Sequence, residues 1–339
     1  MDTKRINLAL QGGGAHGAFT WGVLDRLLDE DWLEFAAITG TSAGALNGAA
    51  LKAGLVVGGR EGARAALRAL WERVAGVGDL SAVGWFRPFM ASAPFVTRLS
   101  EAIMPLSPLN LMSQVISPYD WGPLWRNPLA PVVEALSLDE VCADKGPKLF
   151  VAATNVHSGK VRVFSGDEVT HDAILASACL PTVFRAVEID GEAYWDGGYS
   201  GNPSLHPLYD PALPDDVLIV SINPMYRPNT PNSAPEILNR INEISFNSAL
   251  LRDLRAVAFV KRLIAEGTIT RGAMKDVLVH FVADDDLMRR LSVRSKSTPT
   301  PLLIDTLFNA GRAAATGFLE AHADDIGIRG SVDLAEMFG

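Results

Sequence analysis

Ser42 has the local setting that most directly suggests chemistry. It lies in the sequence GTSAG at positions 40–44, which has the G-x-S-x-G form of a nucleophile elbow. In such an elbow the serine sits on a tight turn between a strand and a helix, and the flanking glycines let the chain pass close to itself. The N-terminus of the following helix favours negative charge that develops beside the serine. Ser42 is therefore a candidate nucleophile, although a plain turn between a strand and a helix uses the same residue types.

A second glycine-rich segment has the sequence GGGAHG at positions 12–17, between a predicted strand and a predicted helix. Backbone N–H groups without side chains at a helix N-terminus form a cradle for an anion. Gly12, Gly13 and Gly14 are therefore candidates for an oxyanion hole. A nucleotide phosphate would fit the same cradle. However, the segment lacks the Lys-Ser/Thr ending of a P-loop, and no acidic residue ends a second strand at the distance that a ribose requires.

A third candidate is Asp196, which precedes two glycines in the sequence YWDGGY at positions 194–199. A carboxylate between the end of a strand and two glycines can approach another loop closely. Asp-Gly is also an ordinary turn, so the residues by themselves leave the role of Asp196 open.

These segments need a scaffold that brings them together. Short apolar strands alternate with helical patterns, which predicts an α/β fold with a mainly parallel sheet covered on both faces. The expected strands cover residues 6–10, 35–39, 148–154, 161–164, 217–223 and 277–282. The expected helices cover residues 18–29, a stretch that follows Gly44 and ends at about Ala53, residues 62–75 and residues 236–266, the last either continuous or broken near Phe246.

The bulk composition excludes several classes of protein. Of 339 residues, 48% are apolar and 20% are charged, and the net charge is −9. This is a globular balance without the basic stripe of a nucleic-acid-binding protein. The two cysteines, Cys142 and Cys179, have no metal-ligand spacing around them, so neither a metal nor another cofactor is expected. The sequence lacks a signal-peptide pattern and a run of eighteen apolar residues, which predicts a soluble, cytoplasmic protein.

The three motifs, in this order, resemble the patatin-like phospholipase family. Three flanking stretches are similar to bacterial members of that family: QGGGAHGAF at 11–19, SACLPTVF at 177–184 and YWDGGYSGNP at 194–203. The resemblance covers roughly residues 5–225. It implies a three-layer α/β/α patatin-like (lysophospholipase-like) fold with a mainly parallel central sheet. It also implies one acyl-hydrolase domain over residues 1–339, with a core at 5–225 and a C-terminal helical and strand extension at 226–339.

By this resemblance, Ser42 attacks an acyl carbonyl and Asp196 takes its proton directly, without a histidine. The N–H groups of Gly12, Gly13 and Gly14 then hold the oxyanion. The implied substrate is a phospholipid, a lysophospholipid or a related acyl ester, cleaved by a phospholipase A-type reaction. A free carboxylate with a pKa of about 4 is a poor base for an alcohol, so this dyad needs a dry site.

Residues 83–135 are expected to form an irregular, apolar cap inserted into the main fold. They include eight of the twenty prolines and three of the seven tryptophans. So many prolines exclude long helices and central strands. The aromatic and methionine side chains there could line a mouth for acyl chains, make transient contact with a membrane surface, or form the core of the insertion.

Two residues depart from the plant-type members of the family, which carry Asp-Gly-Gly-Gly-x-Arg-Gly. Gln11 replaces the aspartate and His16 replaces the arginine. His16 is expected to pack or to orient the loop, or to supply part of the missing positive charge when protonated. Two other functions remain open: an esterase with a Ser-His-Asp triad, whose histidine would be one of His206, His280 and His322, or a non-catalytic protein that binds a nucleotide or an acyl-phosphate. The oligomeric state is left open.

Overall fold

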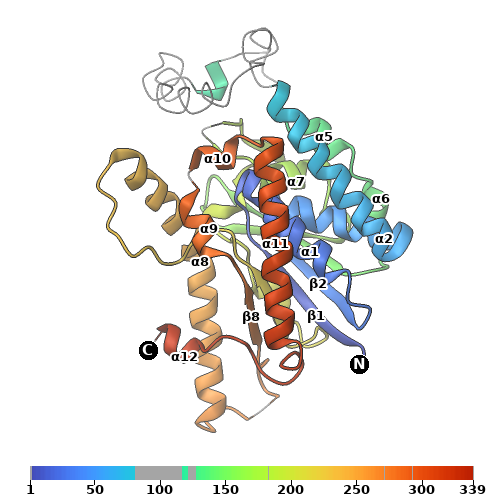
Figure 1. Cartoon of the computed structure of the whole chain (residues 1–339), viewed down its shortest axis with the longest axis vertical. Coiled ribbons are helices and arrows are strands. Elements are labelled where there is room, and N and C mark those ends of the chain that lie inside the picture. The colour runs from blue at the N-terminus through green and yellow to red at the C-terminus, as the bar shows by residue number, and fades with distance from the viewer. Residues whose placement is uncertain are drawn as a thin grey trace.

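The computed structural model describes residues 2–80, 117–120, 127–181, 183–270, 272–291 and 293–338. Most of the predicted cap at 83–135 lies outside these residues. Within them, helices cover both faces of a central sheet (Figure 1). The predicted α/β class with a mainly parallel sheet is confirmed.

Eight strands of the described chain form one mixed sheet in the order β5-β6-β3-β2-β1-β7-β8, with β4 also paired to β3. The run from β3 through β2, β1 and β7 to β8 is parallel, whereas β4, β5 and β6 are antiparallel to their neighbours. The strands are β1 (Lys4–Leu10), β2 (Leu33–Thr41), β3 (Lys148–Asn155), β4 (Val161–Ser165), β5 (Val187–Ile189), β6 (Glu192–Asp196), β7 (Asp216–Val220) and β8 (Leu278–Val282).

Two predicted helices merge in the structure. The helices expected on either side of Gly58 and Gly59 form α2, with a kink at these two residues. The helix expected over 236–266 is continuous, and the long α11 was not predicted. The helices are α1 (Gly17–Leu27), α2 (Ala43–Leu80), α5 (Ala130–Glu134), α6 (Leu138–Val141), α7 (His171–Ser177), α8 (Ala234–Ala265), α9 (Asp285–Arg290), α10 (Val293–Ser297), α11 (Pro301–His322) and α12 (Leu334–Phe338).

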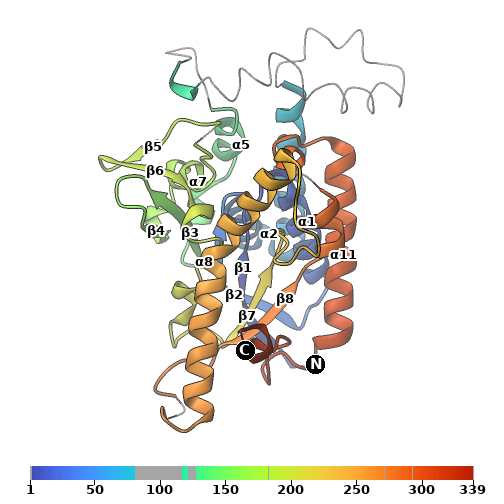
Figure 2. The ribbon, with the colours of Figure 1, turned by 90° about the vertical axis from the view of Figure 1, so that its left-hand side faces the viewer.

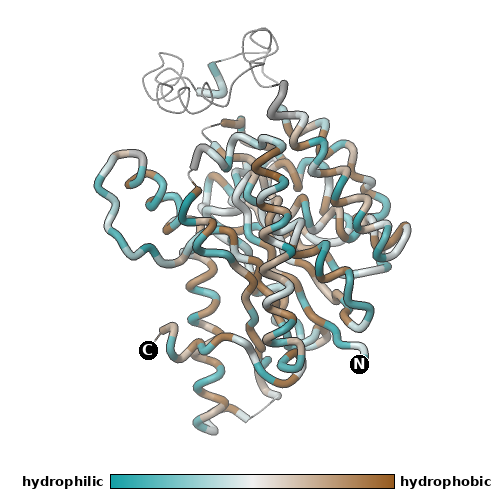
Figure 3. The backbone as a smooth tube through the Cα atoms, in the orientation of Figure 1, coloured by the Kyte–Doolittle hydropathy of each residue, from teal (hydrophilic) through white to brown (hydrophobic). Residues whose placement is uncertain are grey.

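The strands bury both of their faces because successive side chains point to opposite sides of the sheet. Leu8 and Leu10 pack in the core beneath α1, α2 and α11, whereas Ala9 packs in a second core beneath α8. Figure 2 shows α8 and α11 on opposite sides of the strands, and Figure 3 shows apolar residues concentrated along the central strands. The continuous apolar runs in the sequence therefore reflect a sheet between two helical layers.

Helix α11 packs closely against α1, the helix that follows the glycine-rich segment. The rings of Trp21 and Phe308 lie 4.2 Å apart between their centroids. A side chain at Gly311 would collide with the carbonyl oxygen of Phe19, so the two backbones approach closely at this position. Asp25 of α1 forms an ion pair with Arg312 of α11. The C-terminal part of the chain thus fixes the helix that begins beside the candidate site.

The parallel strands end at the same edge of the sheet, since Leu10 pairs with Gly40 and with Val220. The loops after β1, β2 and β7 therefore meet there, as ligand sites do in open α/β sheets. No helix in the described part of the chain is long and apolar enough to cross a membrane.

Candidate active site

Ser42 occupies a strained turn between β2 and α2. Its φ of 54° lies in the left-handed region, which non-glycine residues rarely adopt. The turn is sterically crowded, because a Cβ on Gly44 would collide with the carbonyl oxygen of Leu10. The residue is only 6% exposed. This geometry is that of the predicted elbow, with the serine held at the start of a helix.

One edge of β3 brings Asp196 to Ser42. Strand β4 occupies the other edge of β3, so β2 and β6 share the remaining edge. Thr41, the last residue of β2, pairs with Ala152, and Asp196, the last residue of β6, pairs with Ala153. The ends of β2 and β6 therefore meet, and the candidate nucleophile follows directly at this junction.

The Asp196 carboxyl is completely buried, with an exposed fraction of 0%. Burial raises the pKa of Asp196 to about 7, while the Gly198 N–H, the Ser42 hydroxyl and the positive charge of Lys296 oppose that rise. Its Oδ1 accepts a hydrogen bond of 2.7 Å from the Gly198 N–H. A buried carboxylate with a raised pKa has the basicity that proton transfer at neutral pH requires.

The contact between Ser42 and Asp196 is looser than an ordinary hydrogen bond. No hydrogen bond within 3.5 Å joins these two described side chains, and Oδ2 of Asp196 is buried without a partner. The Ser42 hydroxyl is nevertheless near enough to lower the pKa of Asp196 as a hydrogen-bond donor. Catalytic hydrogen bonds are often long in the absence of substrate and shorten when it binds.

The N–H of Gly12 is already occupied by a partner. It donates a hydrogen bond of 2.6 Å to Oδ1 of Asn202. A Cβ at Gly12 would lie 2.7 Å from Cβ of Ser42 and 2.8 Å from the carbonyl oxygen of Thr41. Gly12 therefore allows the glycine loop to lie directly against the nucleophile, and its own N–H holds the loop to the segment after Asp196.

The N–H groups of Gly13 and Gly14 have no hydrogen-bond acceptor within the described parts of the chain. Gly14 adopts a φ of 59°, and the carbonyl oxygen of Lys296 occupies the space where its Cβ would be. Both residues lie at the N-terminal end of the short 3-10 helix η1 (Gly14–His16), which continues into α1. Of the three predicted oxyanion donors, these two have N–H groups available to an anion.

A buried network of hydrogen bonds around the side-chain amide of Gln11 anchors the glycine loop. Its Oε1 accepts hydrogen bonds from the N–H groups of Ile222 at 2.9 Å and of Asn223 at 3.1 Å, and its Nε2 donates to Oδ1 of Asn247 at 3.1 Å. The Nδ2 of Asn223 donates in turn to the carbonyl oxygen of Gly12 at 2.9 Å. Gln11 uses both the acceptor and the donor of its amide here, which a carboxylate could not do.

His16 does not supply a positive charge. Burial, reinforced by the charge of Lys296, lowers the pKa of His16 to about 3. The ring is therefore neutral at physiological pH, and its Nε2 forms a hydrogen bond of 2.7 Å with the Ser295 hydroxyl. Of the two predicted roles, the structure supports the orientation of the loop and contradicts the role of a cation.

Lys296 supplies a positive charge at this site, and no motif in the sequence pointed to it. Its Nζ donates hydrogen bonds to Oδ1 of Asn223 at 2.7 Å and to Oδ1 of Asn242 at 3.1 Å. It also lies 5.6 Å from the centroid of the Phe246 ring. Burial lowers the pKa of Lys296 to about 8, although the carboxylates of Glu243 and Asp196 oppose that effect.

The six histidines of the sequence all form hydrogen bonds with groups other than Ser42. Of the three candidates for a triad, His206 contacts the Ser204 hydroxyl, His280 contacts Asp216 and His322 contacts Asp325. The other three contact Ser295 (His16), Glu192 (His157) and the carbonyl oxygen of Leu136 (His171).

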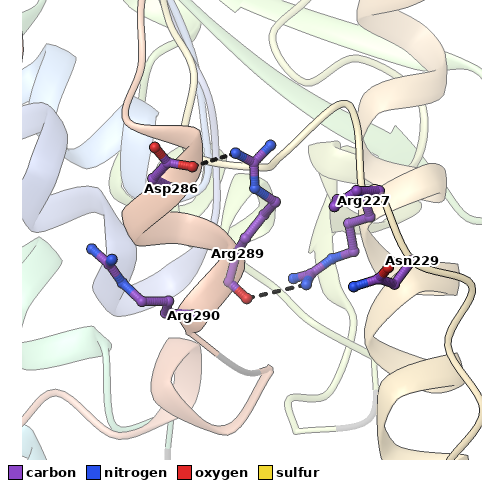
Figure 4. A pocket seen from close by; sticks show the side chains of 6 residues that line it. Arg227, Asn229, Asp286, Arg289 and Arg290 are labelled. Atoms are coloured by element: carbon purple, nitrogen blue, oxygen red, sulfur yellow. Dashed lines mark hydrogen bonds and ion pairs between the residues drawn. The ribbon is translucent and has the colours of Figure 1, made fainter.

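Two cavities lie apart from Ser42 and Asp196. One, of about 1230 Å³, lies between α8, β8 and the C-terminal residues. The other, of about 370 Å³, is lined by charged side chains of the segment before α8 and of α9 (Figure 4). In it, Arg289 pairs with Asp286, and Arg227 donates to the carbonyl oxygen of Arg289. Because Arg227 and Arg289 already have partners, this cavity does not by itself indicate a ligand.

The sequence model of the family described as "Patatin-like phospholipase" matches residues 8–209. This range includes Ser42, Asp196 and the glycine loop, and it ends before α8 and α10. No curated protein matches the chain.

The solved structures that are similar to the chain include the following two. VipD from Legionella pneumophila has 15% identity and a TM-score of 0.41, and the match covers 94% of this chain and 67% of that one. The type III effector protein ExoU has 18% identity and a TM-score of 0.36, and the match covers 94% of this chain and 53% of that one. This chain therefore spans about half the length of the ExoU structure.

Proposed function

This chain belongs to the patatin-like phospholipase family, and from that premise we propose that it is a serine acyl-hydrolase. It cleaves carboxylic ester bonds of phospholipids, lysophospholipids or related acyl esters. Ser42 is the nucleophile and Asp196 is the only side-chain base. The whole chain, residues 1–339, forms one acyl-hydrolase domain with the cap at 83–135, a proposal supported by the pairing of β8 with β7 in the same sheet.

In the first half of the reaction, Oγ of Ser42 attacks the ester carbonyl carbon while its proton moves to Asp196. The carbonyl oxygen becomes an oxyanion that accepts hydrogen bonds from the N–H groups of Gly13 and Gly14. The tetrahedral intermediate collapses, the bond to the alcohol breaks, and Asp196 returns its proton to the leaving oxygen. The product is an acyl-enzyme with an ionised Asp196.

In the second half, Asp196 takes a proton from a water molecule, which attacks the acyl carbonyl carbon. The same two N–H groups hold the new oxyanion. When the intermediate collapses, the proton passes from Asp196 to Oγ of Ser42 and the carboxylic acid leaves. The cycle restores both side chains without a further co-reactant.

The observation that carries this proposal is the burial of Asp196 beside the Ser42 hydroxyl, with the pKa of the carboxyl raised to about 7 because of that burial. A carboxylate of ordinary pKa takes a proton from an alcohol poorly. A base with a pKa near the working pH takes and returns a proton efficiently in one cycle.

Two observations weigh against the alternative functions. The three histidines that could complete a Ser-His-Asp triad form hydrogen bonds with Ser204, Asp216 and Asp325, and none of them forms a hydrogen bond with Ser42. A purely binding protein would have no need of a strained serine, and the φ of Ser42 is a strain that often accompanies function.

The test is the hydrolysis of a chain-length series of acyl esters and phospholipids, together with labelling by a fluorophosphonate probe. We expect the wild type to be labelled at Ser42 and to hydrolyse at least one acyl class. Ser42→Ala and Asp196→Asn should both lower kcat by about 10³-fold or more while remaining folded. Ser248→Ala, on the exposed side of α8, is the matched control and should retain full activity.

Two results would contradict the proposal. If the accessible Ser42 is not labelled and no ester is hydrolysed, the protein is not a hydrolase of this type. If Asp196→Asn keeps the wild-type rate while a histidine variant loses it, the triad mechanism is correct instead.

A further inference from the structure

Helix α10 lies against the glycine loop, although it is outside the range that the family model matches. Ser295 forms a hydrogen bond with the His16 ring, and the backbone of Lys296 fills the space beside Gly14. Ser295 and Lys296 therefore line a site whose sequence motifs all lie within the first two hundred residues.

We propose that Lys296 is a positioning residue for the Ser42–Asp196 dyad: its ammonium group holds Asn223 against the glycine loop and lies beside the Phe246 ring, which packs against Gly198. This inference rests on the proposed function. It assigns the positive charge beside the glycine loop to Lys296. This residue is far in the sequence from Gln11 and His16, the two positions where the chain departs from plant-type members.

Two hydrogen bonds connect Lys296 to the glycine loop through the side chain of Asn223. Its Nζ donates to Oδ1 of Asn223, and Nδ2 of the same amide donates to the carbonyl oxygen of Gly12. The charge fixes which way this amide points, since only the oxygen can accept from an ammonium. That carbonyl and the N–H of Gly13, one of the two free donors, belong to the same planar peptide group, so Lys296 helps to aim this N–H.

Two carboxylates act on the charge of Lys296, and only one of them, Asp196, has no ion-pair partner in the described residues. Glu243 also lowers the energy of the ammonium, but Glu243 is already paired with Arg227 at 2.6 Å and with Arg240 at 3.2 Å. Asp196 forms no ion pair within the described residues. The positive charge of Lys296 lowers the pKa of Asp196 and so favours its ionised form.

Other titratable groups around the pair stay neutral in the working range. Burial, together with the negative charge of Asp196, raises the pKa of Cys179 and that of Tyr199 to about 12 each. His16 is neutral because its pKa is lowered to about 3 by burial and by Lys296. The electrostatic state of the site thus depends on Asp196 and Lys296.

The charge of Lys296 acts on one of the two positions that the negative charge occupies during the reaction. The charge starts on Asp196 and moves to the oxyanion beside Gly13 and Gly14 as the Ser42 proton is transferred. The ammonium of Lys296 favours the charge at the first position, Asp196, and the backbone carbonyl oxygen of Lys296 fills the space beside Gly14.

The experiment compares the pH dependence of kcat/KM for the wild type, Lys296→Met and Lys296→Arg. The wild type should gain activity on an acid limb near pH 7, where Asp196 ionises, and lose it above about pH 8, where Lys296 loses its proton. In Lys296→Met the acid limb should shift upward, because the positive charge of Lys296 lowers the pKa of Asp196 and its loss removes that effect. Lys296→Arg should keep the acid limb and retain activity above pH 8, because a guanidinium stays charged there.

Lys261→Met is the matched control. Lys261 also forms a partly buried ion pair, with Asp276, but it lies near the C-terminal end of α8. Its pH profile should equal that of the wild type. The proposal is overturned if Lys296→Met lowers the rate equally at every pH, because that is the result of a merely structural role. If Lys296→Met does not fold, Lys296→Arg still tests the proposal. The proposal is overturned if Lys296→Arg loses activity above about pH 8 as the wild type does. A wild type without hydrolysis or labelling would instead reject the proposed function.

Discussion

The Ser177 hydroxyl accepts a hydrogen bond of 2.9 Å from the backbone N–H of Ser42. The same hydroxyl donates to the carbonyl oxygen of Ala152 at 2.6 Å. Two residues further on, the carbonyl oxygen of Cys179 accepts a hydrogen bond of 2.8 Å from the backbone N–H of Asp196. The end of α7 and Cys179 just after it therefore hold the backbones of Ser42 and Asp196, and the N–H of Ser42 is not available to an oxyanion.

Replacement of Ser177 by alanine should damage both stability and catalysis. Ser177→Ala leaves the buried N–H of Ser42 without an acceptor, which costs about 1–3 kcal/mol. The strained φ of Ser42 can then relax, and we expect kcat to fall by about 10- to 100-fold with little change in KM. Steady-state kinetics and thermal unfolding measure the two effects. An unchanged kcat would show that Ser177 does not position the nucleophile.

The stability of the protein should fall with rising pH because of Asp196. Its folded-state pKa of about 7 lies above the ordinary value of 3.8, so between these values the folded state holds a proton that the unfolded state has released. Asp196→Asn removes this penalty, which is up to about 4 kcal/mol. The Tm of Asp196→Asn should therefore exceed that of the wild type by more at pH 8 than at pH 5. A difference independent of pH would mean that the carboxyl has an ordinary pKa.

A methyl group at Gly12 should disable the site. In Gly12→Ala the new Cβ meets Ser42 and Thr41 at distances that force the loop away from the nucleophile. A displacement of about 1 Å in a catalytic group lowers the rate by about 10²-fold. Gly76→Ala on α2 is the matched control, because nothing lies within 4 Å of its added Cβ. If the two variants have equal kcat, the close approach of the loop has no catalytic role.

Two glycines of α11 should respond oppositely to alanine. Gly311→Ala pushes against the carbonyl oxygen of Phe19 in α1 and should lower the free energy of unfolding by about 1–3 kcal/mol. Gly317→Ala meets nothing within 4 Å and should raise it by about 0.5–1 kcal/mol, because alanine is the better helix former. Urea unfolding measures both changes in the free energy of unfolding, provided that its dependence on urea concentration (the m-value) stays the same. Equal effects would show that α1 and α11 are not in close contact.

The sequence predicted the parts of the fold that depend on local pattern. Alternating apolar strands and helices gave the α/β class, and the strands at 6–10 and 161–164 lie within one or two residues of β1 and β4. The GTSAG turn gave the position of Ser42, since a tight turn needs small neighbours at fixed offsets. The predicted strand at 217–223 was too long, because Ile222 and Asn223 leave the sheet to bind Gln11.

What the sequence alone determined about this protein is therefore its class, its elbow and its glycine loop, each of which is encoded within a few consecutive residues. The tertiary structure decided which groups those motifs can use. Asn202 occupies the N–H of Gly12, burial raises the pKa of Asp196 and keeps His16 neutral, and Lys296 brings the positive charge from another part of the chain. Burial and charge are sums over every element packed around a group, so no local pattern can encode them.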